Sequence, residues 1–498
     1  MSPANTPSPD LLHRLIWHND AEKLDEALKT SSNVKILDEK EGHVAFIDGK
    51  YRGTTALGLA AQLGHGECIK VLLKHWADTL TSSAIGYYPL QEATSLGDRD
   101  IMRMLLLRRH EQLRQIWRVR QPSLADAIQS DLPNFFLEMD WHFRSWIPFL
   151  SRLCPSDTCR IWKKKNKFRV DSTLMGVEVD KLNWMHGNVS FIFHVNDNNS
   201  KMLALDHDRK LYEEIDKTKE FTEEEIEEDL NMRMNTQIYS GRMRKPKAVT
   251  GEKRVQFVRQ QAGVFGLGGD KEEQVGPYNT RVYDVPDIEA IGKYRKEHII
   301  ARDKEQETES LSMSNHESLD STKVLEEIND VEPQVEHLLQ DAKKNLFVYV
   351  PSLPHPKNLP SVTEREYFAA KTASLPYMHA GRRIVQTEKS KKFRVSVWMA
   401  DNFPLTVRQL MPFFEIMTVG NRNFEKLQEF ISMDLPPGFP VRIEIPLFAF
   451  LAAQITFNNF QHWGDDIPRP QFANGDDWFE VPSDYKRGIV IKNIFKEE

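Results

Sequence analysis

Residues 52–78, "RGTTALGLAAQLGHGECIKVLLKHWAD", are followed by a second stretch of the same design, residues 85–111, "IGYYPLQEATSLGDRDIMRMLLLRRHE". The two stretches match at glycines and at apolar positions, and each matched pair lies 33 residues apart. The pairs are Gly53 with Gly86, Leu57 with Leu90, Gly64 with Gly97 and Leu72 with Leu105. Each stretch reads as a turn, a short helix, a glycine turn and a longer helix, because glycine permits backbone turns that other residues resist.

A period of 33 residues is that of the ankyrin repeat. Residues 11–30, "LLHRLIWHNDAEKLDEALKT", fit as an earlier repeat that is separated from the next by an insert at 33–49. Each repeat buries its apolar face only against its neighbours, so about three repeats are the minimum for stability. The sequence therefore predicts a stack of about three ankyrin repeats over residues 8–118.

The remainder of the chain mixes helical and strand patterns. Residues 391–400, 439–448 and 452–460 alternate as strands, with Pro446 indicating an edge or a break, whereas 406–419 and 423–433 have helical spacing. We predict an α+β fold, an all-α repeat stack followed by a strand-rich domain. Residues 119–150 are expected to be a helical connector, 151–302 and 346–498 the two parts of the strand-rich domain, and 303–345 a disordered acidic and serine-rich insert. A proline-rich path near residues 350–368 is expected to return the chain in extended form.

Composition limits the possible functions. The net charge of −7 over 498 residues gives no reason to expect nucleic-acid binding, which needs clustered positive charge. Three cysteines in so long a chain indicate a reducing compartment without disulfides. The first residues lack a signal-peptide pattern, and no apolar run approaches the ~18 residues that span a bilayer. We expect a cytoplasmic protein whose contact with a membrane is peripheral.

The candidate chemical sites are weak. His186 lies in "KLNWMHGNVSFIF", residues 181–193, where Gly187 and Asn188 indicate a turn between two strands and no acid, Cys or His lies at ligand spacing. Cys154 and Cys159 lack zinc-site partners, and the glycine-rich stretch 263–270 lacks the Lys-Ser/Thr of a phosphate loop, so a loop between strands is favoured. We predict no catalytic residue, metal site or cofactor, and a protein that is not an enzyme.

Two further patterns leave alternatives open. The acidic run at 213–230 is typical of a solvated loop or helix face, although a docking site for a basic partner is the alternative. The first repeat also matches the core of a ubiquitin-interacting helix. We interpret those positions as the buried face of an ankyrin helix, because repeat stacking needs that face inward. They are Leu24, Ala27, Leu28 and Ser31.

Several blocks, in order, resemble the ankyrin repeat domain-containing protein 13 family, also called the GPCR-chaperone domain family. They include "WHFRSWIPFLSRLCPSDTCRIWKK" at 141–164, "RVDSTLMG" at 169–176, "VWMADNFPLT" at 397–406 and "LPPGFPVRIEIPLF" at 435–448. The resemblance covers nearly the whole chain. The ending "WFEVPSDYKRG", with few residues after it, is similar to the C-type members.

The resemblance to C-type members implies a non-enzymatic chaperone for G-protein-coupled receptors. It would act on the cytosolic face of the endoplasmic reticulum, bind receptor loops or tails, and regulate receptor biogenesis and exit. Two alternatives remain open, a ubiquitin-binding endocytic adaptor of the same family and an unrecognised hydrolase. We expect no ubiquitin binding, because the chain lacks a tail of ubiquitin-interacting helices.

The tips of the repeats are the expected contact with a partner, since ankyrin tips project from the stack. Tyrosine and arginine suit binding because they give large contact area at modest entropy cost. The alternative is that Tyr88 packs in place of a small residue and the others are only solvated. The predicted partner-binding residues are Lys50, Tyr51, Arg52, Ile85, Tyr87 and Tyr88.

Overall fold

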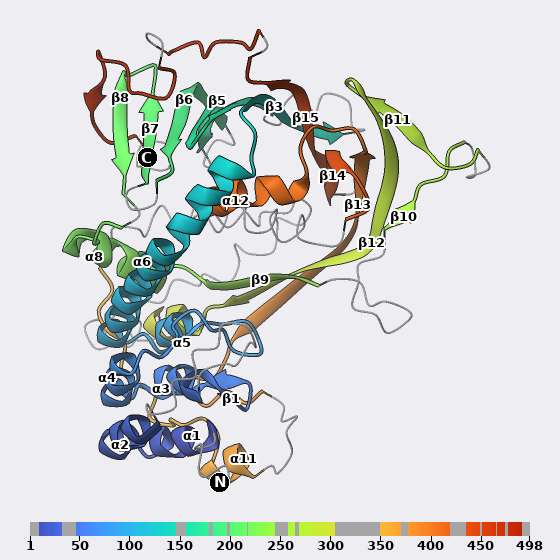
Figure 1. Cartoon of the computed structure of the whole chain (residues 1–498). Helices are drawn as coiled ribbons and strands as arrows, with labels where there is room; N and C mark the ends of the chain where they lie inside the picture. The colour runs from blue at the N-terminus through green and yellow to red at the C-terminus, as the bar shows by residue number, and fades with distance from the viewer. Residues whose placement is uncertain are drawn as a thin grey trace, which may run out of the picture. The chain divides into compact units, whose positions relative to one another are not determined.

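A computed structural model describes most of the chain, which forms two compact units (Figure 1). Unit 1 takes residues 1–114, 220–242 and 292–389, and unit 2 takes residues 115–219, 243–291 and 390–498. The described residues are 9–31, 46–145, 156–178, 183–196, 200–216, 218–244, 257–263, 268–303, 349–369, 377–418, 435–448, 451–464, 466–473 and 477–490. The expected disordered insert, from 304 onward, lies outside them.

Unit 1 contains the ankyrin repeats that the 33-residue period predicts. Their helices are α1 (Pro9–Trp17), α2 (Ala21–Ser31), α3 (Ala56–Leu63), α4 (Gly66–Lys74), α5 (Pro89–Leu96) and α6 (Arg99–Ser130), with a short 3-10 turn Phe46–Asp48 and the two-residue strands β1 (Lys50–Tyr51) and β2 (Thr54–Thr55). The Thr55 hydroxyl caps α3 by accepting from the Gly58 amide at 3.1 Å. Gly64 and Gly97 end α3 and α5 with φ of 75° and 81°, the left-handed conformation that favours glycine.

Later parts of the chain complete the core of unit 1. Helix α8 (Glu223–Asn235) contributes Ile226, Leu230 and Met234 to the same apolar cluster as the repeat helices. Residues 349–369 and 377–386, here called the return segment, add Val350, Leu353 and Tyr367. Among its described residues, the return segment has no regular secondary structure over most of its length and includes the short helix α11 (Glu364–Phe368).

The strands belong largely to unit 2 and join in a 14-stranded sheet. Its main order is β10-β12-β13-β14-β15-β3-β4-β5-β6-β7-β8-β16, and β9 and β11 also pair with β12. The pairs from β13 to β8 are antiparallel, and β16 adds to β8 in parallel. The bounds are β3 (Phe135–Ser145), β4 (Ser156–Lys164), β5 (Lys167–Glu178), β6 (Asn183–His194), β7 (Lys201–Asp206), β8 (Leu211–Ile215), β9 (Ile238–Arg244), β10 (Val258–Arg259), β11 (Glu272–Val275), β12 (Tyr278–Arg295), β13 (Gln386–Ala400), β14 (Phe439–Phe448), β15 (Leu451–His462) and β16 (Lys486–Arg487).

Two helical elements pack on this sheet within unit 2. The second half of α6 buries Leu124 and Ile128, and α12 (Val407–Thr418) buries Leu410 and Phe413, in one cluster with the strand side chains. The rings of Phe413 and Phe168 lie 5.1 Å apart, which joins α12 to β5. The strand and helix patterns at 391–400, 406–419, 439–448 and 452–460 are thereby confirmed in type.

Three local predictions differ from the structure, and one lies outside it. Residues 119–150 are not a helical connector, because α6 ends at Ser130 and β3 follows. The turn at Gly187–Asn188 is wrong, since β6 runs through both residues. They lie where the β5–β6 register shifts, between the Leu174–His186 and Ser172–Val189 pairs. Of the two alternatives predicted at Pro446, the edge is wrong because β14 lies between β13 and β15, whereas the break is confirmed by the β14–β15 register shift beside Pro446. The helix expected at 423–433 lies outside the described residues.

The glycine-rich stretch ending at Asp270 lies between segments that pair with each other, as predicted. Gln261 and Asp270 form an isolated antiparallel β-bridge. Among the described residues, no helix is long and apolar enough to cross a membrane.

Candidate functional site

The first repeat tip is held against the return segment. Arg52 and Gly53, both with positive φ, form the turn between β1 and β2. The Arg52 side chain is 5% exposed and donates to the carbonyls of Tyr367 at 2.7 Å and Glu366 at 3.0 Å. The Tyr51 ring lies 5.7 Å from that of Phe368, whereas Lys50 is exposed. Arg52 is therefore not accessible to a partner, although it lies at a repeat tip, because a distant part of the chain covers it.

The second tip is also used internally. Tyr87 is 1% exposed, and its hydroxyl donates to the Gln386 Oε1 at 3.1 Å. Tyr88 is half-buried beside the Arg109 guanidinium, 5.3 Å from the ring centroid, and Ile85 is half-buried too. The premise that tip side chains are little used for packing is wrong for Arg52 and Tyr87.

The return segment packs closely against the glycine turns of the repeats. The Leu353 amide donates to the Gly97 carbonyl at 2.8 Å, and a Cβ added at Gly97 would lie 2.6 Å from a Leu353 methyl group. The Gln62 side chain accepts from the Ala380 amide at 3.1 Å. The repeat glycines therefore serve close packing as well as the left-handed turn.

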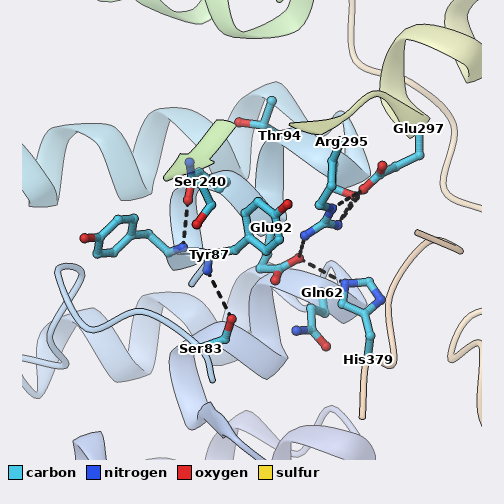
Figure 2. Close-up of polar contacts among 12 residues, drawn as sticks. Gln62, Ser83, Tyr87, Glu92, Thr94, Ser240, Arg295, Glu297 and His379 are labelled. Atoms are coloured by element: carbon cyan, nitrogen blue, oxygen red, sulfur yellow. Dashed lines mark hydrogen bonds and ion pairs between the residues drawn. The ribbon is translucent and has the colours of Figure 1, made fainter. Parts of the chain in front are cut away.

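A charged cluster is buried where α5 meets the end of β12 and the return segment (Figure 2). The Arg295 guanidinium binds the Glu92 carboxylate at 2.9 Å and donates through Nε to Glu297 at 2.6 Å. His379 lies 3.0 Å from the same Glu92 oxygen. The side chains of Arg295, Glu92 and Glu297 are at most 2% exposed. A buried charge is tolerated only when it is paired and hydrogen-bonded, and this cluster meets that condition.

The charges of the cluster hold one another in the ionised state. Burial alone would raise the pKa of Glu92, but Arg295 and His379 outweigh it and lower that pKa to about 2. Burial opposes the charge on Arg295, yet Glu92 and Glu297 together raise its pKa. The stability that Glu92 contributes is present above its unfolded pKa of 4.5 and is lost as the pH falls toward 2.

Part of the acidic run is engaged by other residues of unit 1. Thr222 and Glu225 form a capping box at the start of α8. Glu227 pairs with both Arg99 and Arg103 of α6, the latter at 2.6 Å. Arginines of the same unit therefore already pair with part of the acidic run. The run is only in part the solvated helix face that the sequence predicts.

Sequence reasoning missed Trp76, which follows α4. The Trp76 side chain is 58% exposed. Its backbone has φ of 65°, a left-handed conformation that bulky residues avoid. The Trp76 amide donates to Leu73 O at 3.1 Å, and the Arg108 guanidinium lies 3.9 Å from its ring centroid. Comparison of the repeats could have identified Trp76, because the equivalent position 33 residues later holds a charged residue, Arg109.

Unit 2 contains a serine, a histidine and an aspartate in contact. Ser190 Oγ lies 2.5 Å from both His207 Nε2 and Asp171 Oδ1, and the Arg169 guanidinium donates to the same hydroxyl at 3.0 Å. His207 Nδ1 lies 2.7 Å from the Tyr485 hydroxyl. This convergence is the feature that a hydrolase would require.

The direction of these hydrogen bonds opposes nucleophilic catalysis. The Ser190 hydroxyl donates to Asp171 Oδ1, so its proton is not directed at His207, and Nε2 of His207 is then the donor to Ser190. Burial lowers the pKa of His207 to about 4, which leaves the ring neutral with Nδ1 accepting from Tyr485. A catalytic histidine instead accepts the serine proton while the acid orients its other nitrogen. Ser190 is also fully buried, so the cluster ties β5, β6 and β7 together.

Two of the remaining candidates, His186 and Cys159, lie in strands of the sheet. His186 is exposed in the middle of β6, opposite Leu174. Burial raises the pKa of the Cys159 thiol, while Cys154 lies outside the described residues. In the part of the chain that the structure describes, no group of three His, Cys, Asp or Glu residues could hold a metal ion.

Buried histidine makes unit 1 sensitive to acid. Burial lowers the pKa of His13 from 6.5 to about 3, while its Nδ1 contacts the Tyr367 hydroxyl at 3.0 Å. The unfolded chain takes up a proton below pH 6.5 and the folded His13 does not, so stability falls as the pH falls. Between pH 7 and pH 5 this histidine should cost about 2 kcal/mol of unfolding free energy.

Urea denaturation of His13→Gln at both pH values should show a pH dependence smaller by that amount. His18→Gln is the matched control, because His18 is an exposed histidine at the end of the same helix. An unchanged pH dependence in His13→Gln would mean that His13 is not held neutral.

The fold and these contacts define a class of protein, an ankyrin-repeat protein with a strand-rich C-terminal domain. A family model for ankyrin repeats in three copies matches residues 12–115, and the model described as ANKRD13 C-terminal matches residues 169–486. Mouse ankyrin repeat domain-containing protein 13B is 32% identical over 478 residues, 95% of this chain and 70% of that protein. Mouse protein 13C is 31% identical over 96% of this chain and 79% of its own length, and protein 13C-B of Xenopus laevis is 32% identical over 95% and 81%.

The chain therefore belongs to the ankyrin repeat domain-containing protein 13 family. Identity to the B-type and C-type relatives is nearly equal, so it does not separate the two types.

Proposed function

We propose that this protein is a non-enzymatic chaperone and adaptor that binds cytosolic loops or tails of G-protein-coupled receptors at the endoplasmic reticulum and regulates their biogenesis and exit. The family membership and the resemblance of the chain's ending to C-type members support this role. Ankyrin repeats serve as binding surfaces, and binding that differs between receptor conformations would shift their populations without ATP.

Trp76 is the observation that carries a binding function for unit 1. A left-handed backbone costs a non-glycine residue roughly 1–2 kcal/mol, and glycine is usual after the last turn of a helix. Burial does not repay that cost, because more than half of the side chain is exposed. A role outside the folded chain accounts for a tryptophan at this position.

The surroundings of Trp76 suit a polypeptide partner. Arg108 stacks on the indole and also pairs with Glu111 at 2.9 Å, which limits the freedom of both side chains before binding. Tryptophan and arginine are enriched among residues that dominate binding energy, and a preorganised pair loses little entropy on contact. We assign Trp76 and Arg108 as the centre of the client contact, with Lys50, Ile85 and Tyr88 as further candidates at the tips.

The test is Trp76→Gly in the full chain. Glycine accepts the left-handed conformation, so the free energy of unfolding should stay within about 1 kcal/mol. Co-precipitation of G-protein-coupled receptors should fall by about thirtyfold in affinity, which corresponds to the ~2 kcal/mol of a hot-spot residue. Leu11→Ala, which truncates another exposed apolar residue of unit 1, should leave binding unchanged.

Three results would contradict the proposal. Unchanged receptor binding in Trp76→Gly would remove Trp76 from the client site, and equal capture of single-span receptors would remove the receptor class. Polyubiquitin binding by the folded chain would favour the adaptor alternative. Helix α2 does not support that alternative, because Leu24 and Leu28 are buried and Ala27 is half-buried.

A further inference from the structure

A cavity of about 720 Å³ opens beside the β4–β5 hairpin of unit 2. Its volume is within the range of small-molecule sites, ~300–1,000 Å³. Its wall combines basic and aromatic side chains from the hairpin and from the segment after β15. The lining residues are Lys164, Lys165, Asn166, Lys167, Trp463, Gly464, Ile467, Arg469, Asp477, Trp478 and Phe479.

The hairpin turn is built to present lysines. Lys165 has φ of 55°, and its amide donates to the Asn134 side chain at 2.6 Å, which fixes the turn. The next lysine back, Lys163, turns inward to the Leu132 carbonyl and is 1% exposed. Lys164 and Lys165 are exposed at the mouth of the cavity.

Among the described lining residues, the cavity carries more cationic than anionic side chains. Lys167 pairs with Asp477 at 3.0 Å and with Glu480 at 3.1 Å, so these carboxylates are already engaged. Within the described chain, Lys164 and Lys165 have no carboxylate partner. The Arg469 guanidinium contributes another cation to the wall and donates to the Ala473 carbonyl at 3.1 Å.

Aromatic side chains stand beside these cations. The Lys164 ammonium lies 4.9 Å from the Trp463 ring centroid, and Trp463 lies 5.5 Å from Trp478. Both indoles are half-buried. Tryptophan rings with one apolar and one polar edge favour the headgroup level of membranes, and adjacent lysines favour anionic lipids.

We propose that this cavity binds the phosphate-bearing headgroup of an anionic phospholipid and holds the protein on a membrane surface. Lys164 and Lys165 attract the phosphate, while the indoles and Ile467 contact the interfacial region. Lysines alone would equally suit a free phosphate or an acidic peptide, and the half-buried tryptophans at the same cavity favour the lipid surface. This membrane site does not depend on which partner unit 1 binds.

The test is co-sedimentation of the full chain with phosphatidylcholine vesicles, with and without a phosphatidylinositol phosphate. Binding should require the anionic lipid and weaken as salt rises. Lys164→Ala with Lys165→Ala should reduce affinity by about tenfold to thirtyfold, because each lysine near an anionic surface contributes roughly fivefold. Lys164→Arg with Lys165→Arg should retain binding, because the charge is kept.

The matched control is Lys391→Ala with Lys392→Ala, an adjacent pair of exposed lysines on β13 of the same unit. Equal loss in both alanine pairs would reduce the effect to net charge and overturn the site. Binding of inositol phosphate or of an acidic peptide without vesicle binding would overturn the lipid assignment. Thermal unfolding of every variant should match the parent chain, because all four mutated lysines are exposed.

Discussion

Replacement of Arg295 by methionine is expected to destabilise unit 1 by about 3–5 kcal/mol, the cost of leaving buried partners unpaired. The substitution leaves the Glu92 and Glu297 carboxylates together in a site where both are at most 2% exposed. It also removes the cation that lies 4.6 Å from the centroid of the Tyr87 ring. Hydrogen exchange of the α5 amides should report the loss, because Glu92 and Ser95 of that helix contact Arg295 directly.

Two controls separate burial from charge. Lys70→Met breaks an ion pair with Glu67 whose side chains are 58% and 69% exposed, and it should change stability by less than about 1 kcal/mol. Adding Glu92→Gln and Glu297→Gln to Arg295→Met should recover part of the loss, since the repelling carboxylates are gone. If Arg295→Met costs no more than Lys70→Met, the cluster does not hold unit 1 together.

Tyr367→Ala should be comparably severe, with a loss of about 3–5 kcal/mol for a fully buried aromatic side chain. Tyr367 is 0% exposed, its ring lies 4.9 Å from that of Trp17, and its carbonyl accepts from Arg52. Its removal should release α11 from the first repeat tip. Faster hydrogen exchange at Thr54 and Thr55, together with a lower midpoint of denaturation, would show that release.

Tyr367→Phe is the matched variant for this experiment. It keeps the ring and removes only the hydroxyl that contacts His13, so it should cost about 1 kcal/mol. A Tyr367→Ala protein as stable as Tyr367→Phe would mean that the return segment does not stabilise the tip. The repeat tips would then be open to partners as the sequence suggested.

The sequence was informative wherever a signal is local. Gly64 and Gly97 end helices in the left-handed conformation that their 33-residue spacing predicts, and Thr55 caps α3. The apolar residues within 391–400 and 439–448 predict strands β13 and β14, and both strands contribute buried side chains to one core. The burial of Leu24 and Leu28 follows from the same kind of periodicity.

Non-local features were missed for a physical reason. Gly187 and Asn188 favour a turn locally, but β6 pairs with β5 on both sides of them, at His186 and at Val189, and the Asn188 carbonyl accepts from the His207 amide, so the strand continues. Trp76 was missed because its exposure and its left-handed backbone are invisible to apolar spacing.

The sequence alone determined the repeat period, the glycine turns that end α3 and α5, the strand patterns at 391–400, 439–448 and 452–460, and the family, since each rests on residues close in the chain or on ordered blocks. Only the tertiary structure decided that residues 220–242 and 292–389 complete the ankyrin unit, and that Arg52 and Tyr87 are buried at its tips. It also decided that Ser190, His207 and Asp171 meet with their hydrogen bonds directed against catalysis. Exposure and hydrogen-bond direction depend on which distant segment covers a side chain, and local periodicity carries no information about that segment.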